Sequence, residues 1–206
     1  MNKLASILFL HSIGLPTIFP NIVTERGEKE VRQTVDDFYF EYKGGWVLRC
    51  GRPPDRNDRV EKGMPWDIAY SSEELAGKIL AFQREVGPNY VVFCHPQPIP
   101  ENSRGGIMLV DGAGVLIEAA TGGARELSAF YRGHRDPEQC LEFNPGMLSN
   151  RKYGEGVLSN ADLLALRNIE RTLIWKEFNA VNDPVCVEFS YRRDGSLQVH
   201  DLSLVN

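Results

Sequence analysis

The chain has 206 residues, of which 42% are hydrophobic and 25% are charged, so it can bury a full core as one domain or as two small lobes. A formal net charge of -5 gives no electrostatic reason to bind DNA, RNA or an anionic membrane. The 4 cysteines form no CxxC pair and no cluster with zinc-ligand spacing. This pattern favours reduced thiols in a cytoplasmic protein, with two disulfides as the alternative.

The N-terminal segment imitates the start of a signal peptide, because Lys3 precedes the apolar run 4–10. His11 closes this run, and the Gly-Leu-Pro sequence at 14–16 is typical of a helix stop and not of a cleavage site. We therefore expect a short buried helix over residues 3–13. A secreted α+β protein with a cleaved N-terminus is the more distant alternative. No other apolar stretch approaches membrane-spanning length.

Hydrophobic periodicity and turn residues predict the elements of the first half of the chain. These elements are strands at 17–19 and 22–24, a helix at 28–38, a strand at 46–49, an exposed loop at 50–65, a helix at 73–86 and a strand at 90–93. Ser71 and Glu74 give a capping signal for the second of these helices. The proline-rich segment 96–100 is the expected hinge, so we place one lobe at 1–95 and the other at 96–206.

Two Asp-Gly pairs, at 111–112 and 194–195, favour tight turns in the second half of the chain. Each pair lies between two apolar runs and therefore predicts a hairpin. The expected strands are 105–110 with 114–120, and 185–191 with 197–202, and a long helix is expected at 159–178. Two hairpins without regular βαβ alternation predict an α+β fold of two lobes with mostly antiparallel sheets.

Two acidic residues of the last hairpin are candidate metal ligands. Glu188 lies between Val187 and Phe189, so by alternation it faces away from these apolar neighbours, and Asp201 lies on the paired strand. Carboxylates on neighbouring strands can hold one Mg²⁺ together with phosphates and water. The alternative is that both acids line a solvated face of the sheet.

A basic side chain and three histidines are harder to interpret from spacing alone. Arg49 projects from a strand beside a loop, where it can either clamp a phosphate or pair with a surface carboxylate. His95, His134 and His200 have no nucleophile or metal-ligand spacing around them, so we assign them no role.

Successive segments, taken in order, resemble the ATP-grasp region of the pyruvate phosphate dikinase and phosphoenolpyruvate synthase family. The resemblance covers nearly the whole chain. The matching segments are Lys3–Leu10 running into Gly14-Leu15-Pro16, Val47-Leu48-Arg49, the helix Ser71–Val86, Tyr90–Phe93 leading to Gly105–Leu109, and Pro184–Phe189 with Asp194–Asp201.

This resemblance implies an ATP-grasp fold, in which two lobes enclose a nucleotide cleft that holds ATP and Mg²⁺. It implies that Lys3 and Arg49 hold the triphosphate and serve catalysis. Glu188 would bind Mg²⁺, and Asp201 would stand where the family has a second, amide, metal-side ligand. Glu118 matches only loosely, as a possible nucleotide-facing acid.

The sequence also departs from the family pattern. Cys186 replaces an aspartate, Ser203 replaces an arginine, and Cys50-Gly51 replace paired serines. The chain is too short to contain the family's histidine domain and pyruvate-binding barrel. We expect an ATP-dependent phosphotransferase or ligase that acts on a small molecule or on a histidine-bearing partner protein. The alternative is a non-catalytic nucleotide-binding or scaffold protein derived from the same domain.

Overall fold

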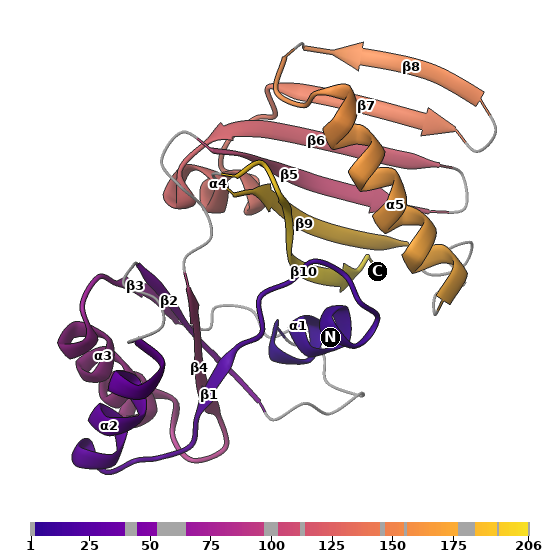
Figure 1. Cartoon of the computed structure of the whole chain (residues 1–206). Coiled ribbons are helices and arrows are strands. Elements are labelled where there is room, and N and C mark those ends of the chain that lie inside the picture. The colour runs from indigo at the N-terminus through magenta and orange to yellow at the C-terminus, as the bar shows by residue number, and fades with distance from the viewer. Residues whose placement is uncertain are drawn as a thin grey trace. The chain divides into compact units, whose positions relative to one another are not determined.

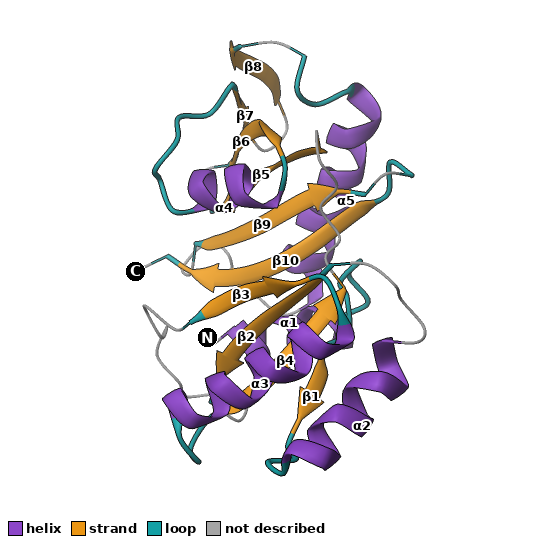
Figure 2. Ribbon diagram, turned by 90° about the vertical axis from the view of Figure 1, so that its left-hand side faces the viewer, coloured by secondary structure: helices purple, strands orange, loops and turns teal. Residues whose placement is uncertain are grey.

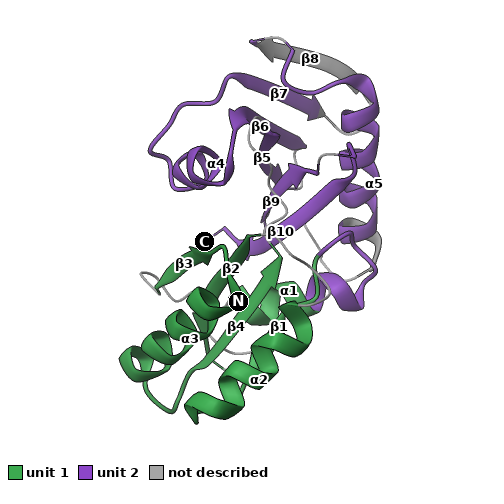
Figure 3. Cartoon of the chain, turned by 60° about the vertical axis from the view of Figure 1, so that its left-hand side comes forward, with its two compact units in different colours: residues 1–8, 18–97 green, residues 9–17, 98–206 purple. Residues whose placement is uncertain are grey.

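The computed structural model (Figure 1) describes residues 3–39, 45–52, 65–96, 103–111, 114–144, 147–154, 156–176, 184–192 and 194–205. The chain forms two compact units, which Figure 3 distinguishes. Unit 1 comprises residues 1–8 and 18–97, and unit 2 comprises residues 9–17 and 98–206. The division near residue 97 lies in the proline-rich segment, and residues 9–17 group with the second unit.

Unit 1 is built on a four-stranded sheet with the order β1-β4-β2-β3, in which every neighbouring pair is antiparallel. Its strands are β1 (Asn21–Val23), β2 (Trp46–Gly51), β3 (Trp66–Ala69) and β4 (Val91–Pro96). The strand that we predicted at 17–19 is absent, so that prediction was wrong. Pro16 and Pro20 flank this segment, and proline cannot donate a hydrogen bond to a sheet.

Helices α2 (Glu28–Tyr39) and α3 (Ser72–Val86) cover one face of this sheet, as Figure 1 shows. The predicted cap of α3 is confirmed, because the Ser71 hydroxyl accepts a hydrogen bond from the Glu74 backbone N–H at 3.1 Å. On this face of the sheet, one hydrophobic core packs both helices against β2 and β4. Its fully buried side chains include Val31, Val35, Trp46, Leu48, Leu75, Ile79, Val92 and Cys94.

Helix α1 (Lys3–Ser12) packs on the opposite face of the sheet, where Leu4 and Ile7 contact Phe93 of β4. A Cβ atom on Gly51 would lie 3.5 Å from the Leu4 Cβ and 3.5 Å from a Phe93 ring carbon. The first turn of α1 therefore lies over the end of β2. The boundary between the two units falls within this helix.

Unit 2 is built on a six-stranded sheet with the order β10-β9-β5-β6-β7-β8, again antiparallel throughout. Its strands are β5 (Ser103–Val110), β6 (Val115–Gly122), β7 (Gln139–Asn144), β8 (Met147–Tyr153), β9 (Val185–Tyr191) and β10 (Leu197–Leu204). The two predicted hairpins are β5–β6 and β9–β10. The predicted α+β class with two mostly antiparallel sheets is confirmed.

Two helices lie on opposite faces of this sheet, as Figure 2 shows: α4 (Ala124–Tyr131) and α5 (Asn160–Lys176). Helix α4 packs through Leu127 and Phe130 against Ala120 and Ile107. We predicted α5 but neither α4 nor the strands β7 and β8.

The remaining predictions concern a loop, the hinge, the cysteines and membrane-spanning segments. The loop predicted at 50–65 begins later than expected, because β2 continues through Gly51, and residues 53–64 lie outside the described part. The hinge residues 97–100 lie outside it as well. All four cysteines are free thiols. None of the helices in the described part is long and apolar enough to cross a membrane.

Candidate functional site

Three carboxylates lie in one cross-strand row of the six-stranded sheet. Asp201 of β10 pairs with Glu188 of β9, and Glu188 pairs with Ile107 of β5, whose partner on β6 is Glu118. Directly paired residues of an antiparallel sheet point to the same face. Glu118, Glu188 and Asp201 are all half-buried, and we refer to them as the acidic row.

The alternation of β9 explains which face the acidic row occupies. Val187, Phe189 and Tyr191 are buried, and the Tyr191 hydroxyl donates to the backbone carbonyl of Asp162 in α5 at 3.2 Å. These apolar side chains therefore fill the core beneath α5. Because side chains alternate along a strand, Glu188 points to the other face.

A β-bulge at His200 brings Asp201 into the acidic row. Val199 pairs with Phe189 and Asp201 pairs with Glu188, so His200 is the extra residue of β10. In a regular ladder without this bulge, His200 would pair with Glu188, and Asp201 would pair with Val187 and point into the core. The His200 ring also reaches this face, because its Nε2 lies 2.6 Å from the Ser190 hydroxyl. Bulges of this kind often re-aim a side chain beside a functional site.

Helix α4 closes one part of the same face. The Tyr131 hydroxyl donates to the Phe189 carbonyl at 2.6 Å. Burial, and then the nearby charge of Glu188, raises the pKa of Tyr131 well above its usual value. A Cβ on Gly105 would lie 2.8 Å from the Tyr131 hydroxyl, so only glycine allows α4 to pack this closely. Tyr131 therefore contacts the backbone of Phe189, the residue that follows Glu188 in β9.

The distances within the acidic row allow two of its carboxylates, but not all three, to contact one cation. Cβ atoms of directly paired residues are about 5 Å apart, so Glu188 and Asp201 can reach one cation. Glu118 lies two strands away from Glu188, which is about 10 Å, so it would contact a different part of a ligand. The Leu202 backbone N–H donates to the Asp201 carboxylate at 2.9 Å and orients it.

The donor set of Glu188 and Asp201 fits Mg²⁺, which is usually bound by one or two carboxylates and completes its octahedron with phosphates and water. Within the described ranges, no group of three or more His, Cys, Asp or Glu side chains can hold a metal ion. The arrangement therefore fits a cation that arrives with a phosphate ligand.

Unit 1 gathers basic side chains on the face that carries α1. Arg49 pairs with Phe93, and Val47 pairs with His95, so Arg49 and His95 project from the same face of the sheet. Burial, followed by the charge of Arg49 and more weakly by that of Lys3, lowers the pKa of His95 to about 4, although its hydrogen bond to Pro96 opposes the shift. Lys3 and Arg49 therefore lie within electrostatic range of one buried imidazole. We refer to Lys3, Arg49 and His95 as the basic cluster.

The predicted site residues thus form two groups. The structure pairs Glu188 directly with Asp201 and places Glu118 in the same row of unit 2. Lys3 and Arg49 belong to the basic cluster of unit 1. That the two groups act on one ligand stays a prediction.

One residue of the basic cluster and two residues beside the acidic row were not predicted. His95 gives no sequence signal, because its environment depends on Lys3 and Arg49, which are far from it in the chain. Tyr131 lies on the unpredicted helix α4. The bulge at His200 appears only in the strand register, for which the sequence gives no signal.

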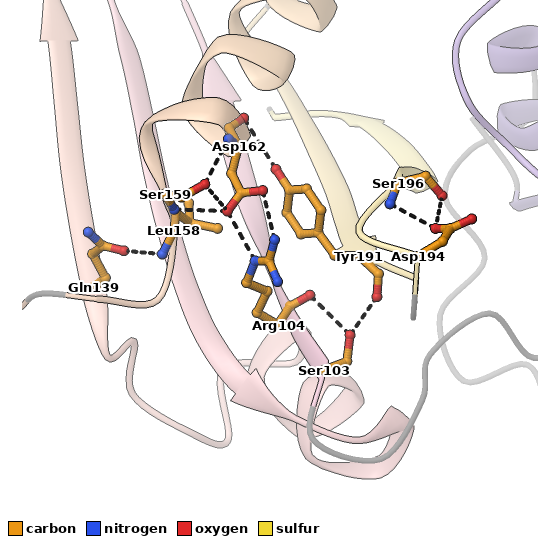
Figure 4. A network of polar contacts seen from close by, with 9 residues as sticks. All are labelled: Ser103, Arg104, Gln139, Leu158, Ser159, Asp162, Tyr191, Asp194 and Ser196. Carbon is orange, nitrogen blue, oxygen red and sulfur yellow. Dashed lines mark hydrogen bonds and ion pairs between the residues drawn. The ribbon is translucent and has the colours of Figure 1, made fainter.

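A separate polar network lies on the α5 face of the sheet, as Figure 4 shows. The Arg104 guanidinium donates to both Asp162 oxygens, at 3.1 and 2.8 Å, and its charged carbon lies 4.4 Å from the centre of the Tyr191 ring. Burial alone would raise the pKa of Asp162, but hydrogen bonds from Arg104 and Ser159 outweigh it and lower this pKa. The network joins the first turn of α5 to β5 and β9, and all its charged groups are paired with one another.

The fold resembles those of known synthetases and ligases. D-alanyl-alanine synthetase A from Vibrio cholerae matches with a TM-score of 0.57 at 8% identity, over 95% of this chain and 53% of that chain. A carboxyaminoimidazole ribonucleotide synthase from Aspergillus clavatus, solved in complex with ATP, matches with a TM-score of 0.54 at 9% identity, over 97% of this chain and 44% of that chain. These neighbours have ATP-grasp folds, and the present fold is of the same kind.

The chain spans about half the length of these solved structures. Its sequence matches no protein-family model and no curated protein.

Proposed function

We propose that the protein binds ATP together with Mg²⁺ and acts as an ATP-dependent ligase or phosphotransferase. The observation that carries the proposal is the direct pairing of Glu188 with Asp201 on the sheet face opposite α5. The ATP-grasp fold supports it, because the neighbours include a D-alanyl-alanine synthetase and a ribonucleotide synthase solved with ATP.

Each group has a distinct task in this proposal. Glu188 and Asp201 hold Mg²⁺, which supplies charge neutralisation on the phosphates. Lys3 and Arg49 bind the triphosphate, and Glu118 contacts the nucleotide. Phosphoryl transfer requires positioning and charge stabilisation more than covalent help from the protein, so these residues can orient the terminal phosphate for attack.

The acceptor is a carboxylate activated as an acyl phosphate, or a histidine of a partner protein. In either case the acceptor atom attacks the terminal phosphorus, and the bond from that phosphorus to the bridging oxygen breaks to release ADP. The synthetases that share the fold favour the carboxylate. The link to the dikinase family rests on the sequence resemblance alone.

A non-catalytic nucleotide-binding protein is the second candidate, and one observation favours it. Cys186 and Ser203, which replace an acid and an arginine of the dikinase pattern, are directly paired across β9 and β10. They lie two residues from Glu188 and Asp201 respectively, on the same face. Both changes therefore fall beside the proposed metal ligands, where loss of charge would weaken catalysis more than binding.

Calorimetry with Mg·ATP tests the proposal. We expect the unmutated protein to bind, and Glu188→Gln to bind on the order of 10- to 100-fold more weakly, because the variant removes a charged ligand of the metal. Glu142→Gln is the matched control, since Glu142 is exposed on the same face and outside the proposed site. No binding by the unmutated protein, or equal loss in both variants, would refute the proposal.

Assays of ATP turnover then choose between the two candidates. ADP release that depends on an added carboxylate, or on a histidine-bearing protein, would support the enzyme. Tight Mg·ATP binding without turnover for any acceptor would support the non-catalytic protein.

A further inference from the structure

His95 is a buried histidine to which the proposed function gives no task. It has a relative exposure of 7% and lies at the end of β4, on the same face as Arg49 and the first turn of α1. Diagonal neighbours on a sheet face are within reach of long side chains, so the Arg49 guanidinium can approach the imidazole. The positive end of the α1 dipole lies on the same face and adds to the field of Lys3 and Arg49.

Hydrogen bonding determines which ring nitrogen of His95 carries the proton. Nδ1 lies 2.9 Å from the Pro96 carbonyl oxygen. A carbonyl oxygen only accepts, so Nδ1 is the donor and carries the hydrogen. The lone pair of the neutral ring is therefore on Nε2, which is the atom that can accept a further proton.

Within the described residues, the charged groups that act on His95 come from two elements, and both are cationic. Strand β2 contributes Arg49, and helix α1 contributes Lys3, while the other titratable residue of α1, His11, is exposed near the far end of the helix. Strand β1 (Asn21–Val23) has no charged side chain. A second proton on His95 would therefore be buried beside two cations. Burial, which is the largest cause, and these two cations together account for a neutral imidazole in the protein without ligand.

We propose that the basic cluster binds an oligophosphate anion together with one proton, which His95 accepts on Nε2. This inference rests on the proposed function in one respect, namely that Lys3 and Arg49 hold phosphate. The anion offsets the field of these two cations, so protonation of the imidazole becomes favourable. The proton comes from solvent, no other bond forms or breaks, and the imidazolium becomes a third cation that stabilises the bound phosphate.

The size of this coupling follows from linkage. The anion removes the cationic contribution to the lowered pKa of His95 and leaves the contribution of burial. The gain in affinity is therefore small at pH 7.5 and larger at pH 5.5, with about tenfold as the upper limit for a pKa fully restored from about 4 to its ordinary value. Phosphates also titrate in this range. The measured quantity is therefore the ratio between the affinity of the unmutated protein and that of His95→Asn, in which the titration of the ligand cancels. Asparagine keeps a donor for the Pro96 carbonyl.

Calorimetry with inorganic triphosphate, without metal, at pH 5.5 and 7.5 tests the inference. Titrations in two buffers of different ionisation enthalpy give the number of protons taken up. We expect more proton uptake at pH 5.5 by the unmutated protein than by His95→Asn, and an affinity ratio that increases by up to about tenfold from pH 7.5 to pH 5.5. His134→Asn, which alters an exposed histidine of unit 2, is the matched control and should behave as the unmutated protein does.

Nuclear magnetic resonance of the unmutated protein provides a test that does not depend on folding of the variant. The His95 imidazole should be neutral at pH 5.5 without ligand and become protonated when triphosphate is added. A spectrum in which no imidazole changes its protonation on binding would overturn the inference.

Failure of the inference can be distinguished from failure of the proposed function. Equal proton uptake by the unmutated protein and His95→Asn, or no triphosphate binding at all, overturns the inference. If Mg·ATP affinity still depends on Glu188, the proposed function survives the first of these results. Proton-coupled triphosphate binding, combined with Mg·ATP binding that Glu188→Gln leaves unchanged, supports the inference and contradicts the proposed metal site.

Discussion

The acidic row and the basic cluster each bring groups of like charge close together, but they differ in how deeply these groups are buried. The acidic row lies on a half-buried sheet face, where Glu188 and Asp201 are placed by strand register alone. The basic cluster joins two strands and the start of a helix, and its third member, His95, is buried and neutral. Like charges can share a half-buried face that water still reaches, because water screens them, whereas a fully buried group beside like charges loses its own charge. In the proposed function, unit 2 therefore supplies the carboxylates that bind the cation, and unit 1 supplies the basic groups that bind the phosphates.

The largest expected effect concerns the sheet that supports the acidic row. A Cβ on Gly106 would clash with the Glu118 carbonyl oxygen and lie 2.7 Å from the Phe189 ring. We expect Gly106→Ala to lower the free energy of unfolding by roughly 3 kcal/mol or more, because backbone cannot move aside cheaply. Gly77→Ala is the control, since nothing lies within 4 Å of a Cβ there and α3 gains a better helix former. Urea denaturation measures both, and a stable Gly106→Ala would contradict the tight strand packing.

A smaller loss is expected from the polar network of the α5 face. Arg104→Met removes the partner of Asp162, which is largely buried, and we expect a loss of about 2 kcal/mol. Because the pKa of Asp162 is lowered in the fold, its contribution is present above the ordinary aspartate pKa and is lost as the pH falls through the lowered value. The variant should therefore show a weaker acid dependence. Affinity for Mg·ATP should not change, and a selective loss of binding would contradict a purely structural network.

The neutral state of His95 should appear in the pH dependence of stability. Its pKa is about 4 in the fold and ordinary in the unfolded chain, so between these values the unfolded state binds more protons. Stability should therefore rise with pH across this window, and at pH 5.5 the cost is about 1 kcal/mol. His95→Asn should remove this component, whereas His134→Asn should keep it. Identical pH profiles for all three proteins would show that His95 is not held neutral.

The smallest effect should come from the acidic row itself. Glu188→Gln removes the repulsion between two directly paired carboxylates, so without metal the stability should rise by about 0.5 kcal/mol or less. Thermal unfolding without metal measures this change. A clear loss of stability would contradict the expected repulsion between the two carboxylates.

The sequence predicted the parts of the fold that depend on local pattern. The alternation of 185–191 and the two Asp-Gly turns were sufficient for the hairpins, and they placed Glu188 and Asp201 on neighbouring strands. Helix α4 was missed because it has only 8 residues and begins after Gly123, whose missing side chain cannot form a cap. Strand β7 was missed although Leu141 and Phe143 alternate with polar residues.

The site was less accessible to sequence reasoning, because its geometry depends on contacts across the chain. The pairing of Asp201 with Glu188 requires the bulge at His200, and a pattern of alternating residues cannot show where a strand gains an extra residue. The role of His95 depends on burial and on charges from residues 3 and 49. The resemblance to the dikinase family supplied Lys3 and Arg49 as candidates, but it gave no reason to group either with a histidine.

The most direct test of the account is ATP affinity measured by calorimetry with and without Mg²⁺ for the unmutated protein, Arg49→Met and Glu188→Gln. If unit 1 binds the phosphates and unit 2 binds the cation, Arg49→Met should weaken ATP binding under both conditions. Glu188→Gln should weaken it only when Mg²⁺ is present. Loss of affinity in Glu188→Gln to the same extent with and without Mg²⁺, or no loss in Arg49→Met, would contradict this division between the two groups.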